Sequence, residues 1–249
     1  MKQSWVNDFY KEQFSMMECN HISEELYKKQ MIEIRDQIGV PFYTVLELGA
    51  GSGLLADQFA KEGITVTTVE LVPEIVQFAK SGNSNSVNIL CGDFYTIDIQ
   101  GKFDLIGYFD GFGVGTDEQQ LFLLQRITNW LKDDGYALID IYQPLYWKKI
   151  NGLEMILNKK RNVLRKYSYQ DNGNRMLDTW WKAECEDFAV TQSLRCYSPD
   201  EISKLCQYAG LEIVAIFPGG AMDYEKMEYH EKVGLSECLS YRIKLKKIL

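Results

Sequence analysis

The fold is decided by the stretch Val45-Leu46-Glu47-Leu48-Gly49-Ala50-Gly51-Ser52-Gly53, an apolar run that ends in three spaced glycines. A short apolar run from Tyr43 to Leu48 is typical of a buried strand. Glycines at its end permit a sharp turn and a close approach of a ligand to the backbone, because they carry no side chain. The stretch therefore predicts a strand followed by a ligand-binding loop.

Strands and helices alternate along the chain after this loop. Expected strands lie at 43–48, 64–69, 87–91, 103–109 and 136–142, and expected helices lie at 54–62, after Pro73 and at 117–131. Two last strands are expected at 211–217 and 238–246, after a helix that begins at the capping-box sequence Ser198-Pro199-Asp200-Glu201. Such alternation predicts an α/β fold, with a Rossmann-like, mainly parallel sheet of seven strands and helices on both faces.

Length and charge limit the classes of function. A chain of 249 residues can bury one substantial core, and its formal net charge of -8 would repel a polyanion such as DNA. The sequence shows no signal peptide and no run of about 18 apolar residues, so we expect a cytoplasmic protein that does not bind membranes. Six scattered cysteines without a C-x-x-C pair predict neither disulfides nor a metal site.

Acidic residues stand at or near the ends of three successive strands. Glu47 lies within the first strand, where a carboxylate needs a positively charged partner, such as the α-amino group or sulfonium of a cofactor. Glu70 ends the second strand and can accept hydrogen bonds from ribose hydroxyls. Asp93 follows the third strand and could receive an adenine amino group while Phe94 packs on the ring. Together they predict a site for an adenosyl cofactor.

Four motifs in order make the chain similar to the class I S-adenosylmethionine-dependent methyltransferases. They are Val45–Gly53, Val69-Glu70, Gly92-Asp93-Phe94 and Phe103-Asp104-Leu105-Ile106. The resemblance covers residues 43–142, and the segment 198–210 is similar to the helix before the last two strands in that family. It implies a methyltransferase that uses S-adenosylmethionine to methylate an O or N atom of a small-molecule acceptor.

The resemblance also implies roles for individual residues. Glu47 and the glycine loop would hold the methionine part of the cofactor, Glu70 the ribose, and Asp93 with Phe94 the adenine. Phe109 and Asp110 would flank the position of methyl transfer, and Tyr10 and Phe14 would lie on a lid. The residues expected to bind the cofactor are Tyr10, Glu47, Gly49, Ala50, Gly51, Gly53, Glu70, Leu71, Asp93, Phe94 and Phe109.

Four segments follow from these expectations. We expect an N-terminal helical lid at 1–40, the cofactor-binding core at 41–142, an inserted antiparallel layer on the substrate side at 143–197, and the last helix and strands at 198–249. The lid would hold two helices, the second from about Ile22 to Ile38. The insertion is expected because Arg165–Tyr169, Met176–Ala183 and Phe188–Cys196 look like strands around the turn Asp171-Asn172-Gly173-Asn174.

Several alternatives remain open at this stage. Leu54 occupies the position of the third glycine in the dinucleotide fingerprint, which disfavours NAD. Tyr108-Phe109-Asp110-Gly111 replaces the Asn/Asp-Pro-Pro-Tyr sequence of enzymes that methylate nucleic-acid or protein amides. A protein or RNA methyltransferase and a non-catalytic module that binds S-adenosylmethionine remain as other functions. No catalytic residue and no oligomeric state can be predicted.

Three further features allow two interpretations each. His21 and His230 are the only histidines and would serve as a general base or simply be solvated. The basic excess from Lys148 to Lys182 would attract an anionic acceptor or belong to a solvated face. The aromatic residues of the insertion would form an acceptor pocket or a cage for a cation, or would pack in the core; they are Tyr146, Trp147, Tyr167, Tyr169, Trp180 and Trp181.

Overall fold

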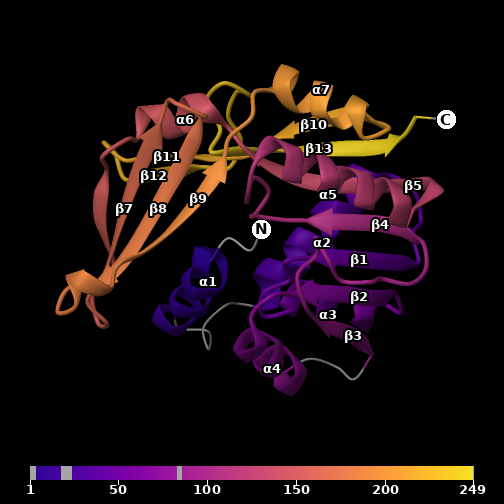
Figure 1. The fold of residues 1–249 in the computed structure, drawn as a ribbon, viewed down its shortest axis with the longest axis horizontal. Helices are drawn as coiled ribbons and strands as arrows, with labels where there is room; N and C mark the ends of the chain where they lie inside the picture. The colour runs from indigo at the N-terminus through magenta and orange to yellow at the C-terminus, as the bar shows by residue number, and fades with distance from the viewer. Residues whose placement is uncertain (1–3, 18–23, 83–85, 249) are drawn as a thin grey trace.

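A seven-stranded, mainly parallel sheet forms the centre of the computed structural model, which describes residues 4–17, 24–82 and 86–248 (Figure 1). Its strand order is β10-β13-β5-β4-β1-β2-β3, with β13 antiparallel to both neighbours and the other described pairs parallel. The strands are β1 Thr44–Leu48, β2 Thr65–Glu70, β3 Val87–Cys91, β4 Phe103–Tyr108, β5 Leu131–Tyr142, β10 Leu211–Pro218 and β13 Ser240–Lys247. The predicted Rossmann-like fold is therefore confirmed.

Helices cover both faces of this sheet because each contributes one apolar side. On one face, α5 (Asp117–Trp130) and α7 (Pro199–Tyr208) bury aliphatic residues against Ile106 and Ile139. On the other face, α2 (Glu24–Ile38) and α3 (Leu54–Lys61) pack on Val45 and Leu105, while α4 (Pro73–Gly82) contacts β2 and β3. The capping boxes expected at Thr116 and Ser198 both form.

A second, four-stranded antiparallel sheet carries the order β6-β7-β8-β9 and stands apart from the first (Figure 1). It consists of β6 Glu154–Asn158, β7 Val163–Gln170, β8 Arg175–Lys182 and β9 Val190–Arg195. Sequence analysis missed β6, the preceding α6 (Pro144–Lys149), and the short hairpin of β11 (Ala221–Asp223) and β12 (Glu228–His230).

The helix α1 (Ser4–Met16) packs on β9. In the part of the chain that the structure describes, no helix is long and apolar enough to span a membrane.

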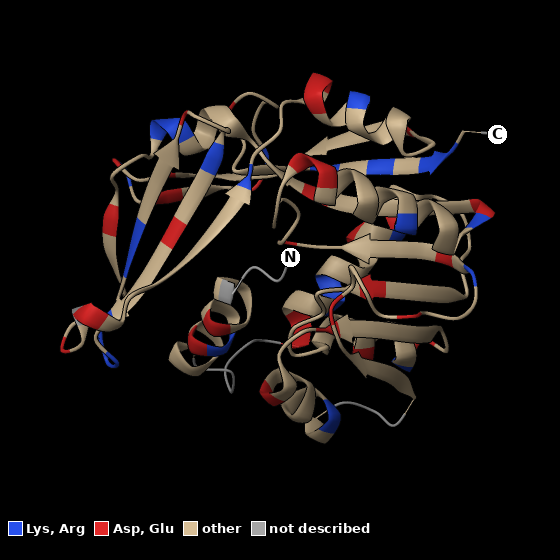
Figure 2. Cartoon of the chain, viewed as in Figure 1, with Lys and Arg blue, Asp and Glu red and all other residues tan. Residues whose placement is uncertain are grey.

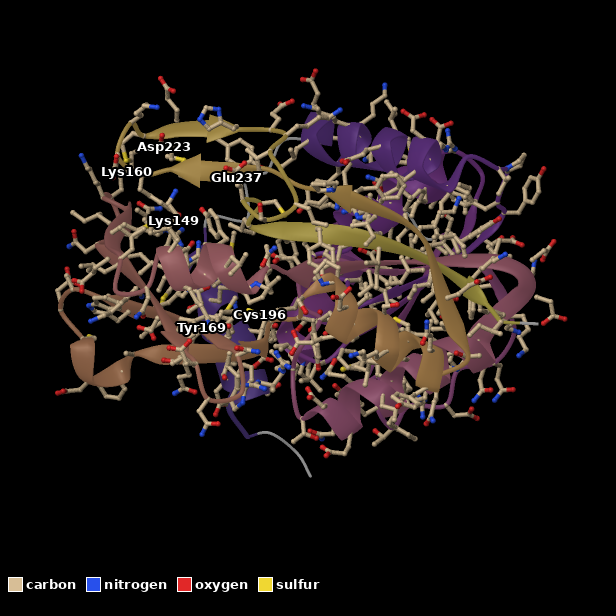
Figure 3. All side chains as sticks on the ribbon, turned by 90° about the horizontal axis from the view of Figure 1, so that it is seen from above. Lys149, Lys160, Tyr169, Cys196, Asp223 and Glu237 are labelled. Atoms are coloured by element: carbon tan, nitrogen blue, oxygen red, sulfur yellow. The ribbon has the colours of Figure 1, made fainter. Side chains whose placement is uncertain are left out.

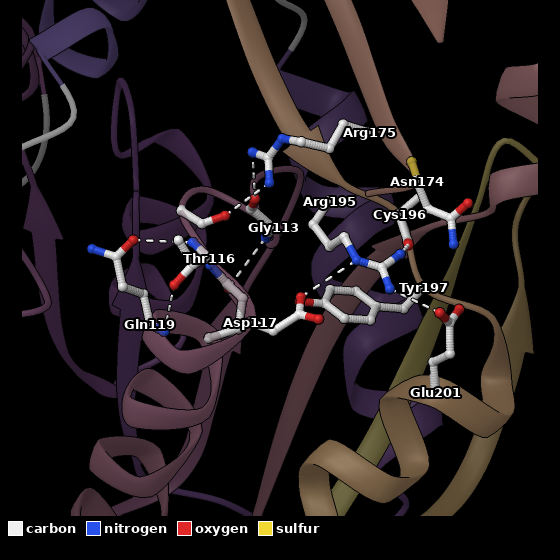
Figure 4. Close-up of polar contacts among 12 residues, drawn as sticks. Gly113, Thr116, Asp117, Gln119, Asn174, Arg175, Arg195, Cys196, Tyr197 and Glu201 are labelled. Atoms are coloured by element: carbon white, nitrogen blue, oxygen red, sulfur yellow. Dashed lines mark hydrogen bonds and ion pairs between the residues drawn. The ribbon is translucent and has the colours of Figure 1, made fainter. Parts of the chain in front are cut away.

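The loop after β4 is fastened to the second sheet through two arginines (Figure 4). Arg175 of β8 donates hydrogen bonds to the carbonyl oxygens of Gly115, at 2.8 Å, and Gly113, at 3.3 Å. Arg195 of β9 lies 3.3 Å from a carboxylate oxygen of Asp117, which also accepts a hydrogen bond from Tyr197. The two sheets therefore hold this loop between them.

Asp104, in the fourth motif, has a structural role, as its position at the start of a strand suggests. Burial alone would raise the pKa of its carboxyl, but hydrogen bonds from Lys132, Tyr43 and Thr44 lower the pKa to about 2. These bonds join the amino ends of β1 and β4, far from the glycine loop at the opposite end of β1. Asp104 therefore stabilises the sheet and does not contribute to the site.

Candidate active site

A cavity of about 880 Å³ opens at the carboxyl ends of the parallel strands, where the chain order reverses between β1 and β4. Open α/β sheets bind ligands at this point, because the loops on the two sides of the reversal diverge. Side chains from α1 and α2 also line the cavity, and Figure 1 shows α1 between the parallel strands and the second sheet. The volume lies near the upper end for small-molecule sites.

The glycine loop forms one wall of this cavity. Gly49 has φ 65° and Gly51 has φ 54°, in the left-handed region that favours glycine. Gly53 has φ 71° and precedes the first turn of α3, but it does not line the cavity. The other ten residues predicted to bind the cofactor do line it, and they are Tyr10, Glu47, Gly49, Ala50, Gly51, Glu70, Leu71, Asp93, Phe94 and Phe109.

Glu47 is the most unusual group at the glycine loop. Its side chain is only 6% exposed, and its Oε2 atom has no hydrogen-bond partner among the described residues. Burial, with a smaller contribution from the charge of Glu70, raises the pKa of Glu47 to about 8. A buried carboxylate without a partner is costly. The site therefore fits a ligand that brings a positive charge, as the amino group of S-adenosylmethionine does.

Replacement of Glu47 by glutamine should remove a pH dependence of stability. The folded protein holds the Glu47 proton up to about pH 8, whereas the unfolded chain releases it near 4.5. The free energy of unfolding of the ligand-free protein should therefore fall between pH 5 and 8, by on the order of a few kcal/mol, and Glu47→Gln should flatten this fall. Denaturant titrations at both pH values measure the difference. The exposed control Glu212→Gln should keep the wild-type slope, and a wild-type slope in Glu47→Gln would contradict the assignment.

Glu70 holds the glycine loop in place. Its two carboxylate oxygens accept hydrogen bonds from the backbone N–H groups of Gly51 and Val72, each at 2.9 Å. Burial raises the pKa of Glu70, and these backbone hydrogen bonds oppose the rise. Because each carboxylate oxygen can accept more than one hydrogen bond, Glu70 retains free lone pairs for ribose hydroxyls.

Asp93 and Phe94 lie on the neighbouring wall of the cavity. Asp93 accepts a hydrogen bond from the backbone N–H of Tyr95 at 2.8 Å, which fixes the turn after β3. The Phe94 ring lies 4.8 Å from the ring of Tyr95 and 5.3 Å from that of Tyr108, measured between centroids. This aromatic wall beside an acidic acceptor suits an adenine, whose flat ring stacks and whose amino group donates.

Sequence analysis missed the polar chain that holds α1 over the cavity. The Tyr10 hydroxyl donates to Gln192 of β9 at 3.3 Å, and Gln192 donates to Asp178 of β8 at 3.2 Å. Arg165 of β7 donates two hydrogen bonds to Asp178, each at 2.7 Å. Asp178 is fully buried. These residues are far apart in sequence and show no common spacing, so only the folded chain brings them together.

The loop after β4 adds a second polar pair, Asp110 with Tyr142, of which sequence analysis singled out only Asp110. Asp110 adopts φ 56°, which is uncommon for residues other than glycine and is best tolerated by asparagine and aspartate. Its carboxylate lines the cavity and accepts a hydrogen bond from the Tyr142 hydroxyl. The resemblance placed Asp110 beside the methyl-transfer position, whereas nothing in the sequence indicated Tyr142.

The aromatic residues of the insertion belong to the core. All six are buried, none lines the cavity, and the interpretation as an acceptor pocket is therefore not supported. Figure 3 shows Tyr169 beside Cys196, which shares its apolar cluster. Basic residues of the insertion form ion pairs, such as Lys148 with Asp171, and basic and acidic positions both occur on β8 (Figure 2). His230 is exposed on β12, away from the cavity, and His21 lies outside the described residues.

Comparisons with known proteins agree with this geometry. Residues 45–135 match the family model described as a methyltransferase domain. No curated protein sequence matches the chain. Among solved structures, the chain is similar to an S-adenosylmethionine-dependent methyltransferase from Clostridium acetobutylicum, with 17% identity, 96% of this chain and 98% of that chain covered, and a TM-score of 0.71.

Two further solved structures share the fold over almost their full length. The CcbJ methyltransferase from Streptomyces caelestis has 15% identity, 98% of this chain and 96% of that chain covered, and a TM-score of 0.72. CalS10, an amino pentose methyltransferase from Micromonospora echinaspora solved with S-adenosylmethionine, has 17% identity, 96% of each chain covered and a TM-score of 0.64.

The fold and the cavity together define an α/β protein with a ligand site at the reversal of its strand order. The matched domain runs from β1 through α5 to the start of β5 and includes the glycine loop, Glu70 and Asp93. Residues 45–135 are therefore a methyltransferase domain, as the motifs implied, and the chain as a whole has the fold of solved class I S-adenosylmethionine-dependent methyltransferases. S-adenosylmethionine is the methyl donor of this class.

Proposed function

We propose that the protein transfers a methyl group from S-adenosylmethionine to an oxygen or nitrogen atom of a small-molecule acceptor. The observation that carries this proposal is the cavity itself, which residues of the sheet's loops and of α1 and α2 line together. Its volume of about 880 Å³ accommodates a cofactor and a small acceptor together. A macromolecular acceptor would instead need an open groove that leads to the methyl group.

Each wall of the cavity has a separate part in this proposal. The glycine loop and Glu47 bind the methionine part, Glu70 and Leu71 the ribose, and Asp93 with Phe94 the adenine. The bound cofactor supplies a methyl group that is already activated by its sulfonium. The chain then has to orient the acceptor and exclude water, which accounts for most of the acceleration in such a transfer.

The N-terminal segment 1–40 acts as the lid in this proposal. Tyr10, Gln13 and Phe14 of α1 and Tyr27 of α2 line the cavity together with the loops of the sheet. Phe14 packs edge-on against Phe78 of α4, with 5.2 Å between ring centroids. The lid therefore rests on the same helix layer that supports β2, and its closure excludes water from the acceptor.

Transfer of a labelled methyl group tests the function. The protein is incubated with S-adenosylmethionine labelled in its methyl group and with a cell extract divided by size into small molecules, proteins and RNA. We expect the label to appear in the small-molecule fraction, together with S-adenosylhomocysteine. Label in protein or RNA would favour the macromolecular alternative, and binding of the cofactor without transfer to any fraction would indicate a non-catalytic module.

A further inference from the structure

The cavity is strongly acidic. Four carboxylic side chains line it, and they are Glu47, Glu70, Asp93 and Asp110. Among the described residues that line it, none is a lysine, arginine or histidine. An anionic acceptor would find no basic side chain on this lining, whereas a cationic acceptor would be attracted by the carboxylate of Asp110, which is not assigned to the cofactor.

Asp110 is separate from the three acidic residues assigned to the cofactor. It follows β4, on the other side of β1 from Glu70 and Asp93, in the loop held by Arg175. The hydrogen bond from Tyr142 and the left-handed backbone fix the direction of its carboxylate. Groups that act electrostatically on Asp110 are Tyr10 of α1, Tyr108 of β4, Asp140 and Tyr142 of β5, Arg165 of β7 and Asp178 of β8.

We propose that the acceptor is an amine that enters the cavity as an ammonium ion, and that Asp110 accepts its proton before methyl transfer. This inference rests on the proposed function and narrows its acceptor to nitrogen. The acidic lining favours the ammonium form of the acceptor. Asp110 is the base, because it lines the cavity and is not among the residues assigned to the cofactor.

The reaction balances without any further reactant. The Asp110 carboxylate removes one proton from the ammonium group, which frees the nitrogen lone pair. The nitrogen attacks the methyl carbon, a C–N bond forms, and the electron pair of the S–C bond passes to sulfur, which gives S-adenosylhomocysteine. The proton then leaves Asp110 for solvent, so that one proton is released per methylated amine.

The environment of Asp110 suits this role. The carboxyl is accessible from the cavity, but protein surrounds the cavity closely, and this desolvation raises the pKa of Asp110 to about 6, against the lowering effect of the Tyr142 hydrogen bond. At pH 7 the group is mostly ionised and able to take a proton. A carboxylate of this basicity is far too weak a base for an aliphatic alcohol, which disfavours an aliphatic hydroxyl group as the acceptor.

The test sorts acceptors by charge. Small molecules from a cell extract are separated into cationic, neutral and anionic fractions, and each is incubated with the protein and methyl-labelled S-adenosylmethionine. We expect label in the cationic fraction, on nitrogen. Label confined to the neutral or anionic fraction, or on oxygen, would overturn the proposal while leaving the methyltransferase function intact. Absence of label from all fractions, with the cofactor bound, would refute the proposed function itself.

Asp110→Asn then tests the base. Asparagine tolerates the left-handed backbone, so the variant should fold and bind S-adenosylhomocysteine as the wild type does. With the cationic fraction as acceptor, we expect kcat/KM at pH 7 to fall about a hundredfold. The rate of the variant should then rise about tenfold per pH unit, as the amine loses its own proton, whereas the wild-type rate should level off.

A matched control separates this effect from a general change of charge. Asp98 is exposed and does not line the cavity, so Asp98→Asn should keep the wild-type rate and pH profile. A pH profile of Asp110→Asn parallel to that of the wild type would show that Asp110 does not accept the proton, whatever the loss of rate.

Discussion

Replacement of Glu70 by alanine is expected to weaken the binding of S-adenosylmethionine at least about a hundredfold. In the proposed site Glu70 accepts hydrogen bonds from both ribose hydroxyls, and hydrogen bonds to a charged group contribute about 1.5–3 kcal/mol each. Two such bonds correspond to about 3 kcal/mol or more, and each 1.4 kcal/mol is tenfold in affinity. The variant also releases the Gly51 and Val72 N–H groups, which loosens the glycine loop. Calorimetric titration with S-adenosylmethionine and S-adenosylhomocysteine measures the change.

Two controls make the Glu70 result specific. The surface variant Glu212→Ala removes an exposed carboxylate at the far edge of the sheet and should bind both adenosyl ligands with wild-type affinity. A thermal melt of Glu70→Ala should still show one cooperative transition, which separates loss of the ligand site from loss of the fold. Wild-type affinity in Glu70→Ala would remove Glu70 from the cofactor site.

Replacement of Asp178 by alanine should destabilise the protein by about 3–5 kcal/mol, because it leaves a largely buried guanidinium without its counter-ion. Arg165 donates two hydrogen bonds to Asp178 and lies over the rings of Tyr167 and Trp180, at 4.5 and 4.9 Å from their centroids. Gln192, which bonds Tyr10, also loses its acceptor. For a chain of this length the loss corresponds to a fall in Tm of about 10 °C, measured by calorimetry.

An ion pair on the surface of the same sheet provides the comparison. Glu154 of β6 and Lys166 of β7 lie 3.9 Å apart, and both side chains are about half exposed. Solvent screens such a pair, so Glu154→Ala should leave the Tm close to that of the wild type. Equal melting temperatures for Asp178→Ala and the wild type would show that the polar chain does not hold the second sheet and α1 together.

Local patterns in the sequence determined the first sheet and the cofactor side of the cavity. The apolar run before Gly49, the alternation of strands and helices, and the two capping boxes each depend on neighbours within a few residues. Such signals predict where an element begins and ends and on which edge its last residues lie. The acidic residues at the ends of β1, β2 and β3 were therefore predictable, since parallel strands bring their carboxyl ends to one edge.

The sequence did not predict several other features of the structure. The short elements α6, β6, β11 and β12 carry little periodicity and form because the rest of the chain supports them. The aromatic residues of the insertion were equally consistent with an acceptor pocket and with a hydrophobic core. Their burial depends on which distant residues pack against each ring. Gly53 was predicted to bind the cofactor because it belongs to the row of three spaced glycines. In the structure it lies at the turn into α3 and does not line the cavity.

The sequence by itself determined the fold and the methyltransferase domain, whereas only the tertiary structure decided the electrostatics of the cavity. The raised pKa values of Glu47 and Asp110 result from burial by distant segments, and the chain from Tyr10 through Gln192 to Asp178 joins residues more than 160 positions apart. The physical reason is that helices, turns and caps depend on residues that are close in the sequence. The desolvation and the electrostatic potential of a group in a cavity depend on all the elements that enclose the cavity.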